Sequence, residues 1–188
     1  GPEGKVDILF IDDNSASMEQ EQKRLGDRFA SFAVELKEYD GQAAVTTTDC
    51  DTTSDYNICG SFLDFAGTNS HILTKDTPNF LDAFQRTIQR PETYDPATGT
   101  ACFITNTCPT SFETPLQALI KSMDKRNGDN RGFFRDRSDL AIVILSDEDE
   151  NSNVRSHDVI NQFKRVWPKD KKIQAYGIII EPGDSACL

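Results

Sequence analysis

The chain has 188 residues, of which 37% are hydrophobic and 27% charged, and its formal net charge is −11. This size and composition are typical of one globular domain with a hydrophobic core, and exclude a disordered chain. The negative charge disfavours binding to nucleic acid or to an anionic membrane, and no apolar run is long enough for membrane insertion.

The N-terminus reads Gly1-Pro2 without a methionine, which is typical of the scar left by cleavage of a fusion tag. Residues 1–4 are therefore assigned to this scar and a short leader. Residues 5–188 are expected to form a single domain.

The first half of the chain alternates between strand and helix patterns. Residues 6–11 are an apolar run that ends in acidic residues, which predicts a buried parallel strand with carboxylates at its carboxyl end. Residues 42–48 predict a second strand, and residues 61–66 a short edge strand. Between the first two strands, apolar residues at helical spacing predict a long amphipathic helix that ends at Asp40-Gly41: Met18, Leu25, Phe29, Phe32 and Leu36.

A second helix is expected to begin with Thr77 as N-cap and Pro78 at its first position. Its buried face would carry Leu81, Phe84 and Ile88. Residues 91–111 are rich in Thr, Pro, Gly and Asn and predict a long loop.

The remaining elements continue the alternation. Apolar residues predict a helix from about Pro115, namely Leu116, Leu119, Ile120 and Met123. Residues 140–145 predict a central strand, and 173–180 the last strand. Between them, Ile160, Phe163 and Trp167 are spaced as in a helix, which Pro168 ends.

Alternating strands and helices predict an α/β fold with a doubly wound, mostly parallel sheet flanked by helices, which is Rossmann-like. In such sheets ligands bind beyond the carboxyl ends of the strands. Acidic residues follow both the first strand and the strand at 140–145, so this edge is the expected binding site.

The residues after the first strand fit a metal site. Asp13, Ser15 and Ser17 alternate along a turn and can direct their oxygens to one point. Asp147 supplies a second carboxylate and Thr114 a further hydroxyl. Oxygen ligands with few charges suit Mg²⁺, with Mn²⁺ or Ca²⁺ as the other candidates.

Five cysteines are present, and four of them bracket short polar loops. We predict the disulfides Cys50–Cys59 and Cys102–Cys108, which indicate an extracytoplasmic location, either periplasmic, cell-surface or secreted. Cys187 is left without a partner. A zinc site is not expected, because there is no CxxC spacing and His71 and His157 are isolated.

Together these motifs resemble the metal-ion-dependent adhesion site of von Willebrand factor A (vWA) domains. The segments FIDDNSASM and ILSDEDE, and residues 130–135 (NRGFFR), are similar in particular to bacterial secreted or surface members of that family. The resemblance implies that Asp13, Ser15 and Ser17 bind the metal directly, and that Thr114 and Asp147 bind it directly or through water.

The resemblance further implies a function in adhesion or protein interaction, not an enzyme. The metal would accept an Asp or Glu carboxylate from a protein partner, whose identity the sequence does not indicate; nor does it indicate the oligomeric state. The vWA domains continue with another helix, strand and helix after the position of Ile180. The resemblance therefore leaves three alternatives: the domain is truncated, the missing strand comes from elsewhere, or the elements differ in number from those predicted.

Several residues have alternative interpretations. Ser15 or Ser17 could cap the long helix, and Thr114 with Gln117 forms a capping-box pattern. Glu113 is an alternative metal ligand to Thr114. Residues 148–150 are expected to be a solvated acidic loop, and Asp12 to point away from Asp13.

Two enzyme classes compete with the binding module. Asp12, Asp13 and Asp147 could serve a Mg²⁺-dependent phosphotransfer receiver or a Mg²⁺-dependent hydrolase. A receiver needs a phosphoacceptor Asp after a second buried apolar strand and a Lys after a later one, but Asp49 follows three threonines and Lys169 follows a helix. Neither class accounts for Ser15 and Ser17 together with the cysteines, and the sequence has no GxSxG motif or phosphate-binding glycine loop.

Overall fold

The computed structural model describes residues 4–168 and 171–179, without the side chains of residues 30–38 and 179. Its main sheet has five strands in the order β3-β2-β1-β6-β7. The central strand β1 (Lys5–Asp12) pairs in parallel with β2 (Asp40–Thr47) and with β6 (Asp139–Ser146), and β6 pairs in parallel with β7 (Ile173–Ile179). The edge strand β3 (Leu73–Thr74) is antiparallel to β2. The fold is therefore mixed α/β with a mostly parallel sheet.

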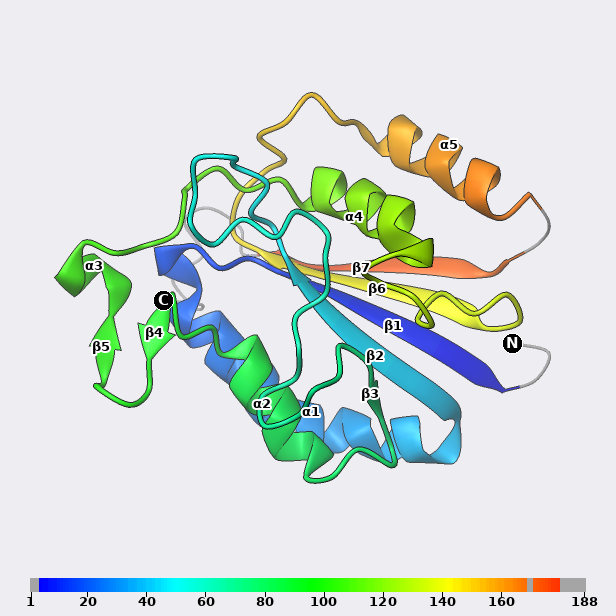
Figure 1. Cartoon of the computed structure of the whole chain (residues 1–188), viewed down its shortest axis with the longest axis horizontal. Coiled ribbons are helices and arrows are strands. Elements are labelled where there is room, and N and C mark those ends of the chain that lie inside the picture. The colour runs from blue at the N-terminus through cyan, green and yellow to red at the C-terminus, as the bar shows by residue number, and fades with distance from the viewer. Residues whose placement is uncertain (1–3, 169–170, 180–188) are drawn as a thin grey trace.

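Helices cover both faces of this sheet (Figure 1). One face carries α1 (Glu19–Glu38) and α2 (Phe80–Ile88), and the other carries α4 (Pro115–Asp124) and α5 (Ser156–Val166). The short 3-10 turns η1 (Ala16–Met18) and η2 (Lys125–Asn127) precede α1 and follow α4.

Residues 8–11 of strand β1 are all apolar because successive side chains enter different cores. Ile8 and Phe10 face α1 and α2, where Phe84 lies with its ring centroid 5.0 Å from that of Phe10. Leu9 and Ile11 face α4 and α5 and belong to the second core cluster. The continuous apolar run predicted from the sequence is thus explained by burial on both faces.

Two predictions for the segment between β2 and α2 are wrong. Residues 61–65 have no regular secondary structure and residues 66–67 form a turn, and the edge strand is instead β3. Individual hydrogen bonds join this segment to β2; for example, Leu63 N donates to Val45 O at 2.9 Å. Helix α2 begins at Phe80 rather than Pro78, because the Thr77 hydroxyl accepts a bond from Thr74 N at 3.0 Å and closes a turn.

The amphipathic faces of two helices also differ from expectation. Leu81 of α2 is 36% exposed, and Ile160 of α5 is 50% exposed. In α5 the buried positions are Val159 and Gln162, while Phe163 packs against the second core cluster. Phe32, Leu36, Lys169, Ile180 and Cys187, which the sequence analysis also used, lie outside the residues or side chains described.

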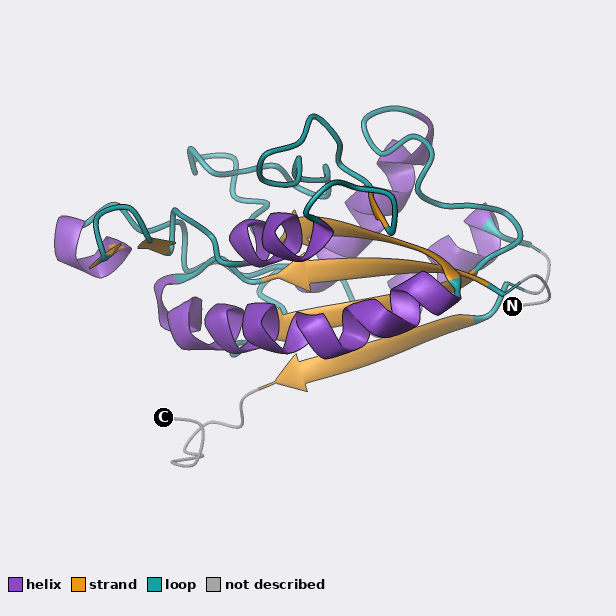
Figure 2. Ribbon diagram, turned by 90° about the horizontal axis from the view of Figure 1, so that it is seen from below, coloured by secondary structure: helices purple, strands orange, loops and turns teal. Residues whose placement is uncertain are grey.

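Residues 91–111 are not a plain loop. They contain the hairpin β4 (Tyr94–Asp95) and β5 (Thr100–Ala101), followed by the short helix α3 (Cys102–Thr105). We call residues 94–108 the arm, and Figure 2 shows it projecting beyond the end of the sheet. The disulfide Cys102–Cys108 closes its tip, and Cys50–Cys59 closes the loop after β2, so both predicted pairings are confirmed.

The two disulfides are compatible with an extracellular protein. Within the part of the chain that the structure describes, no helix has the length and apolar character needed to cross a membrane.

The loop after β2 packs against α4 at Gly60, which generates a stability prediction. Gly60 has φ +81°, and a Cβ there would lie 2.5 Å from Ser122 N. At Gly67, with φ +76°, a Cβ would meet only Arg86 Nη1, at an ordinary contact distance of 3.9 Å. We expect Gly67→Ala to cost about 1 kcal/mol of backbone strain, and Gly60→Ala about 1–3 kcal/mol more because of the clash. Urea unfolding of both variants tests this, and equal losses would contradict the close approach.

Candidate metal centre

Asp13 directly follows β1 and is completely buried. Its backbone N–H donates to Leu145 O at 2.9 Å, so the pairing of β1 with β6 continues into the loop. Ser15 N donates to Asp13 Oδ1 at 2.9 Å, and the Ser146 hydroxyl donates to Oδ2 at 2.8 Å. The carboxylate is thereby fixed between the loop and the end of β6.

The hydroxyls of Ser15 and Ser17 lie 3.1 Å apart. Ser15 occupies the N-cap position of η1, yet its side chain caps no backbone N–H. The alternative interpretation of Ser15 as a helix cap is therefore wrong. Ser15 also contacts Asp13, so this hydrogen bond links Ser17 to the same loop.

The start of α4 is tied to the end of β2. Thr114 donates to Thr48 O through its backbone N–H at 3.1 Å and through its hydroxyl at 2.8 Å. The capping-box interpretation is wrong, because the hydroxyl is turned toward β2 and caps no N–H of α4. A hydroxyl that donates to a carbonyl still has lone pairs, so Thr114 remains a possible ligand.

Glu150 performs the capping role instead. Its Oε2 accepts a bond from Leu116 N, in the first turn of α4, at 2.5 Å. The neighbouring Asn151 N donates to Glu113 O at 2.9 Å. The prediction of a solvated acidic loop is therefore wrong for Glu150, although Glu148 and Asp149 are exposed.

Two carboxylate oxygens at this edge have no hydrogen-bond partner among the described residues: Glu113 Oε2 and Asp147 Oδ1. Glu113 is 3% exposed, and Asp147 follows β6. Burying such an oxygen without a partner is unfavourable unless a proton or cation neutralises it. These orphaned atoms are the feature of the site that calls for a ligand.

The electrostatics of the site also disfavour the charged forms of its acids when no cation is bound. The pKa of Glu113 is raised to about 8. Burial is the main cause, the negative charges of Asp13, Glu148 and Asp147 add to it, and a hydrogen bond with Ser15 opposes it. Burial also raises the pKa of Asp13, with a smaller contribution from Asp147. No basic group among the described residues offsets these charges.

The residues present fit a hard cation that is bound by mixed oxygen ligands. In the described part of the chain, no three His, Cys, Asp or Glu side chains are grouped closely enough to hold a metal by themselves. A site here must therefore combine Asp13, Asp147 or Glu113 with the hydroxyls of Ser15, Ser17 or Thr114. Such a donor set suits Mg²⁺ or Mn²⁺.

Asp12 lies on the opposite face of the sheet from Asp13, as expected. It continues the row of Ile8 and Phe10, is fully buried, and both of its carboxylate oxygens lack a partner among the described residues. Burial raises its pKa, and the Arg90 guanidinium lowers it. Asp12 therefore does not share a ligand with Asp13.

A polar network behind the loop was not predicted from the sequence. Gln22 donates to Asp13 O at 2.8 Å and accepts from Arg90 N at 3.1 Å. Thr93 donates to Asn14 O at 2.8 Å. These bonds hold the Asp13–Ser17 loop against α1 and the segment after α2, and no spacing pattern in residues 91–111 signals them.

Comparisons with known proteins locate the fold but not the function. The sequence matches no protein-family model and no curated protein sequence. Among solved structures it is similar to proximal thread matrix protein 1 from the mussel byssus, with 14% identity and a TM-score of 0.51. The alignment covers 95% of this chain but 38% of the mussel chain, so the likeness shows the fold alone.

The raised pKa of Glu113 predicts a pH-dependent stability in the absence of metal. The folded state binds this proton up to about pH 8, whereas the unfolded state releases it near 4.5. With EDTA present, the free energy of unfolding should therefore fall as pH rises from about 5 to 8. Glu113→Gln should flatten this decline in urea unfolding, and Mg²⁺ should oppose it; an unchanged slope in the variant would contradict the assignment.

Proposed function

We propose that this chain is a vWA-type interaction module that binds one divalent cation and, through it, a carboxylate of a protein partner. The observation that carries the proposal is the pair of orphaned oxygens, Glu113 Oε2 and Asp147 Oδ1, beside the fixed Asp13 carboxylate. Asp13 and Glu113 are buried, and Asp147 is partly buried. Because these acids have no basic neighbour among the described residues, a cation is favoured as their ligand.

The residues of the proposed site have different roles, as direct ligands, indirect ligands or supports. Asp13, Ser15 and Ser17 would hold the cation directly, and Thr114 and Asp147 directly or through water. When bound, the metal supplies a Lewis-acidic position that an Asp or Glu side chain can occupy. Gln22 and Ser146 keep Asp13 in place, which preserves the geometry of the ligands.

The arrangement of the sheet supports a doubly wound fold. From β1 the chain passes to β2 on one side, and later to β6 on the other, so the strand order reverses at β1. Ligands of doubly wound sheets bind where the order reverses. Asp13 and Asp147 follow the two strands that flank this point, β1 and β6.

The two disulfides are in keeping with an extracytoplasmic location, because they suit an oxidising compartment.

We favour binding over catalysis because neither histidine is positioned at the loops. His71 contacts Arg131 O at 3.3 Å, and His157 pairs with Asp158, so both rings are engaged away from the metal loops. Asp12 faces the opposite side of the sheet from Asp13, which disfavours the paired carboxylates that a receiver or hydrolase would use. The candidate phosphoacceptor Asp49 already accepts a bond from Ser54 at 2.5 Å.

The metal assignment predicts the behaviour of Asp13→Ala. Loss of a supporting residue near a metal costs about 10–100-fold in affinity, so loss of a direct ligand should weaken Mg²⁺ or Mn²⁺ binding by at least about 100-fold. Isothermal titration calorimetry measures this, with Asp76→Ala as a control at an exposed aspartate. Undiminished affinity in a folded Asp13→Ala protein would refute the site.

A second pair of variants separates Thr114 from Glu113. We expect Thr114→Ala to cost about 0.5–1.5 kcal/mol of stability, because the bond to Thr48 O is lost, and also to weaken Mg²⁺ binding. Thr114→Ser should retain both properties. If calorimetry shows that Glu113→Gln loses the metal while Thr114→Ala retains it, the ligand is Glu113.

A further inference from the structure

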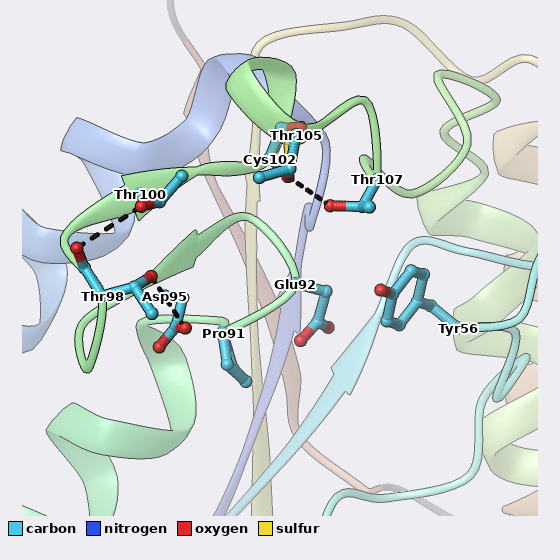
Figure 3. A pocket seen from close by; sticks show the side chains of 9 residues that line it. All are labelled: Tyr56, Pro91, Glu92, Asp95, Thr98, Thr100, Cys102, Thr105 and Thr107. Carbon is cyan, nitrogen blue, oxygen red and sulfur yellow. Dashed lines mark hydrogen bonds between the residues drawn. The ribbon is translucent and has the colours of Figure 1, made fainter.

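A groove runs between the two loops that the disulfides close. Its larger part is a pocket of about 580 Å³ between Tyr56 and the arm, and its smaller part, of about 500 Å³, shares Tyr56 and Thr107 with the first. Figure 3 shows Tyr56 on one side of the larger pocket, Glu92 facing it, and the threonines of the arm above. We call the two parts together the interloop groove.

The groove adjoins the candidate metal centre but is distinct from it. Glu92, in its wall, accepts a hydrogen bond from Asn14 Nδ2 at 3.4 Å, and Asn14 belongs to the Asp13–Ser17 loop. On the other side, Asp49 forms an isolated bridge with Glu113 and leads into the 50–59 loop. A partner that reaches the metal centre would therefore also meet the groove.

The segments that form the groove carry negative charge only. Residues 40–74 and 91–120 contain no Lys or Arg, although the chain has 20 of them. Arg90 pairs with Glu92 at 2.8 Å. Asp51, Asp55 and Asp95 also line the groove and form no ion pair with any described residue. Three carboxylates thus remain without a positive neighbour.

Two of these carboxylates, those of Asp51 and Asp95, are held by hydrogen bonds. Hydrogen bonds from Thr53 to Asp51, and from Ala97 and Thr98 to Asp95, lower the pKa of both groups. Because the bonds orient each carboxylate within its own turn, the negative field is held in place before a ligand arrives.

The groove also has aromatic and apolar surface that can contact the charged group and the methylene chain of a basic side chain. Tyr56 is 38% exposed and offers its ring to both pockets, where a cation could lie against the π face. Pro91 lines the larger pocket and can contact a methylene chain. On the arm, Phe103 and Ile104 are 65% and 68% exposed, and they offer an apolar surface to the residues that flank the basic one.

We propose that the interloop groove binds a lysine or arginine side chain of a polypeptide partner, between Tyr56 and the carboxylates of Asp51, Asp55 and Asp95. The inference rests on the proposed function only in taking the ligand to be a polypeptide. The groove itself requires no metal. Its recognition rests on charge complementarity and therefore weakens as salt screens the carboxylates.

The test uses a short peptide without any carboxylate, acetyl-Ser-Gly-Arg-Gly-Ser-amide, and a second peptide with citrulline in place of arginine. Citrulline keeps the shape of arginine but lacks its charge. Amide chemical shifts of the ¹⁵N-labelled protein are followed in EDTA and in Mg²⁺. We expect the arginine peptide to shift the amides of residues 51–56 and 95–107 equally in both buffers, and the citrulline peptide to bind at least tenfold more weakly.

Variants with matched controls locate the site. Tyr56→Ala and Asp55→Asn should each weaken binding of the arginine peptide about threefold or more. Tyr176→Ala, at an exposed tyrosine of β7, and Asp76→Asn, at an exposed aspartate, should leave it unchanged. Binding should also fall at 0.5 M NaCl.

The outcomes separate this proposal from the metal centre. Equal binding of the citrulline peptide, shifts confined to other residues, or no binding would each overturn the groove while leaving metal binding by Asp13 intact. Loss of metal binding in Asp13→Ala with normal peptide binding would support both assignments. Peptide binding that appears only with Mg²⁺ would also overturn the groove as an independent site.

Discussion

Burial of like charges at the carboxyl ends of β1 and β6 is the constraint on which this molecule depends. Parallel pairing of the two strands brings Asp13 and Asp147 to one edge, and the start of α4 adds Glu113. Burial and mutual repulsion raise the pKa of Glu113 to about 8, so near neutral pH the group is held between protonation and charge. In the proposed function, a cation would compete with a proton for these oxygens, so metal binding would depend on pH.

The loop that carries these ligands is held before any ligand binds. Gln22 supports Asp13 from α1, Ser146 holds its carboxylate from β6, and Thr93 fixes Asn14 from the segment after α2. Because the supports come from different elements, the whole α1–α2 layer must be in place for the turn to keep its geometry. Preorganisation of this kind reduces the entropy that binding must overcome.

The elements that the sequence predicts well are those whose burial is complete. Residues 6–11 and 140–145 were predicted as strands and lie within β1 and β6, because continuous apolar runs need two buried faces. Patterns within one segment predict the wrong hydrogen bonds where a residue far along the chain supplies the partner. The Thr114 hydroxyl bonds to Thr48 O, 66 residues away, and Glu150 caps α4 across 34 residues. The two-residue strands of the arm are too short for any periodicity to reveal them.

The opposite edge of the sheet shows how this fold treats a buried acid that serves stability. Asp7, near the start of β1, is fully buried, and Arg135 Nε donates to it at 2.7 Å. Ser138 also donates to Asp7, and the nearly buried Lys171 lies 4.0 Å away. Near the start of β1, Asp7 is thus neutralised by bases. Asp13, directly after the strand, and Glu113 have no basic group among the charges that shift their pKa. The example of Asp7 shows that this fold can place a basic group beside a buried acid. Because the acids at the carboxyl edge have no such group among the described residues, their charge favours a positively charged ligand there over a purely structural role.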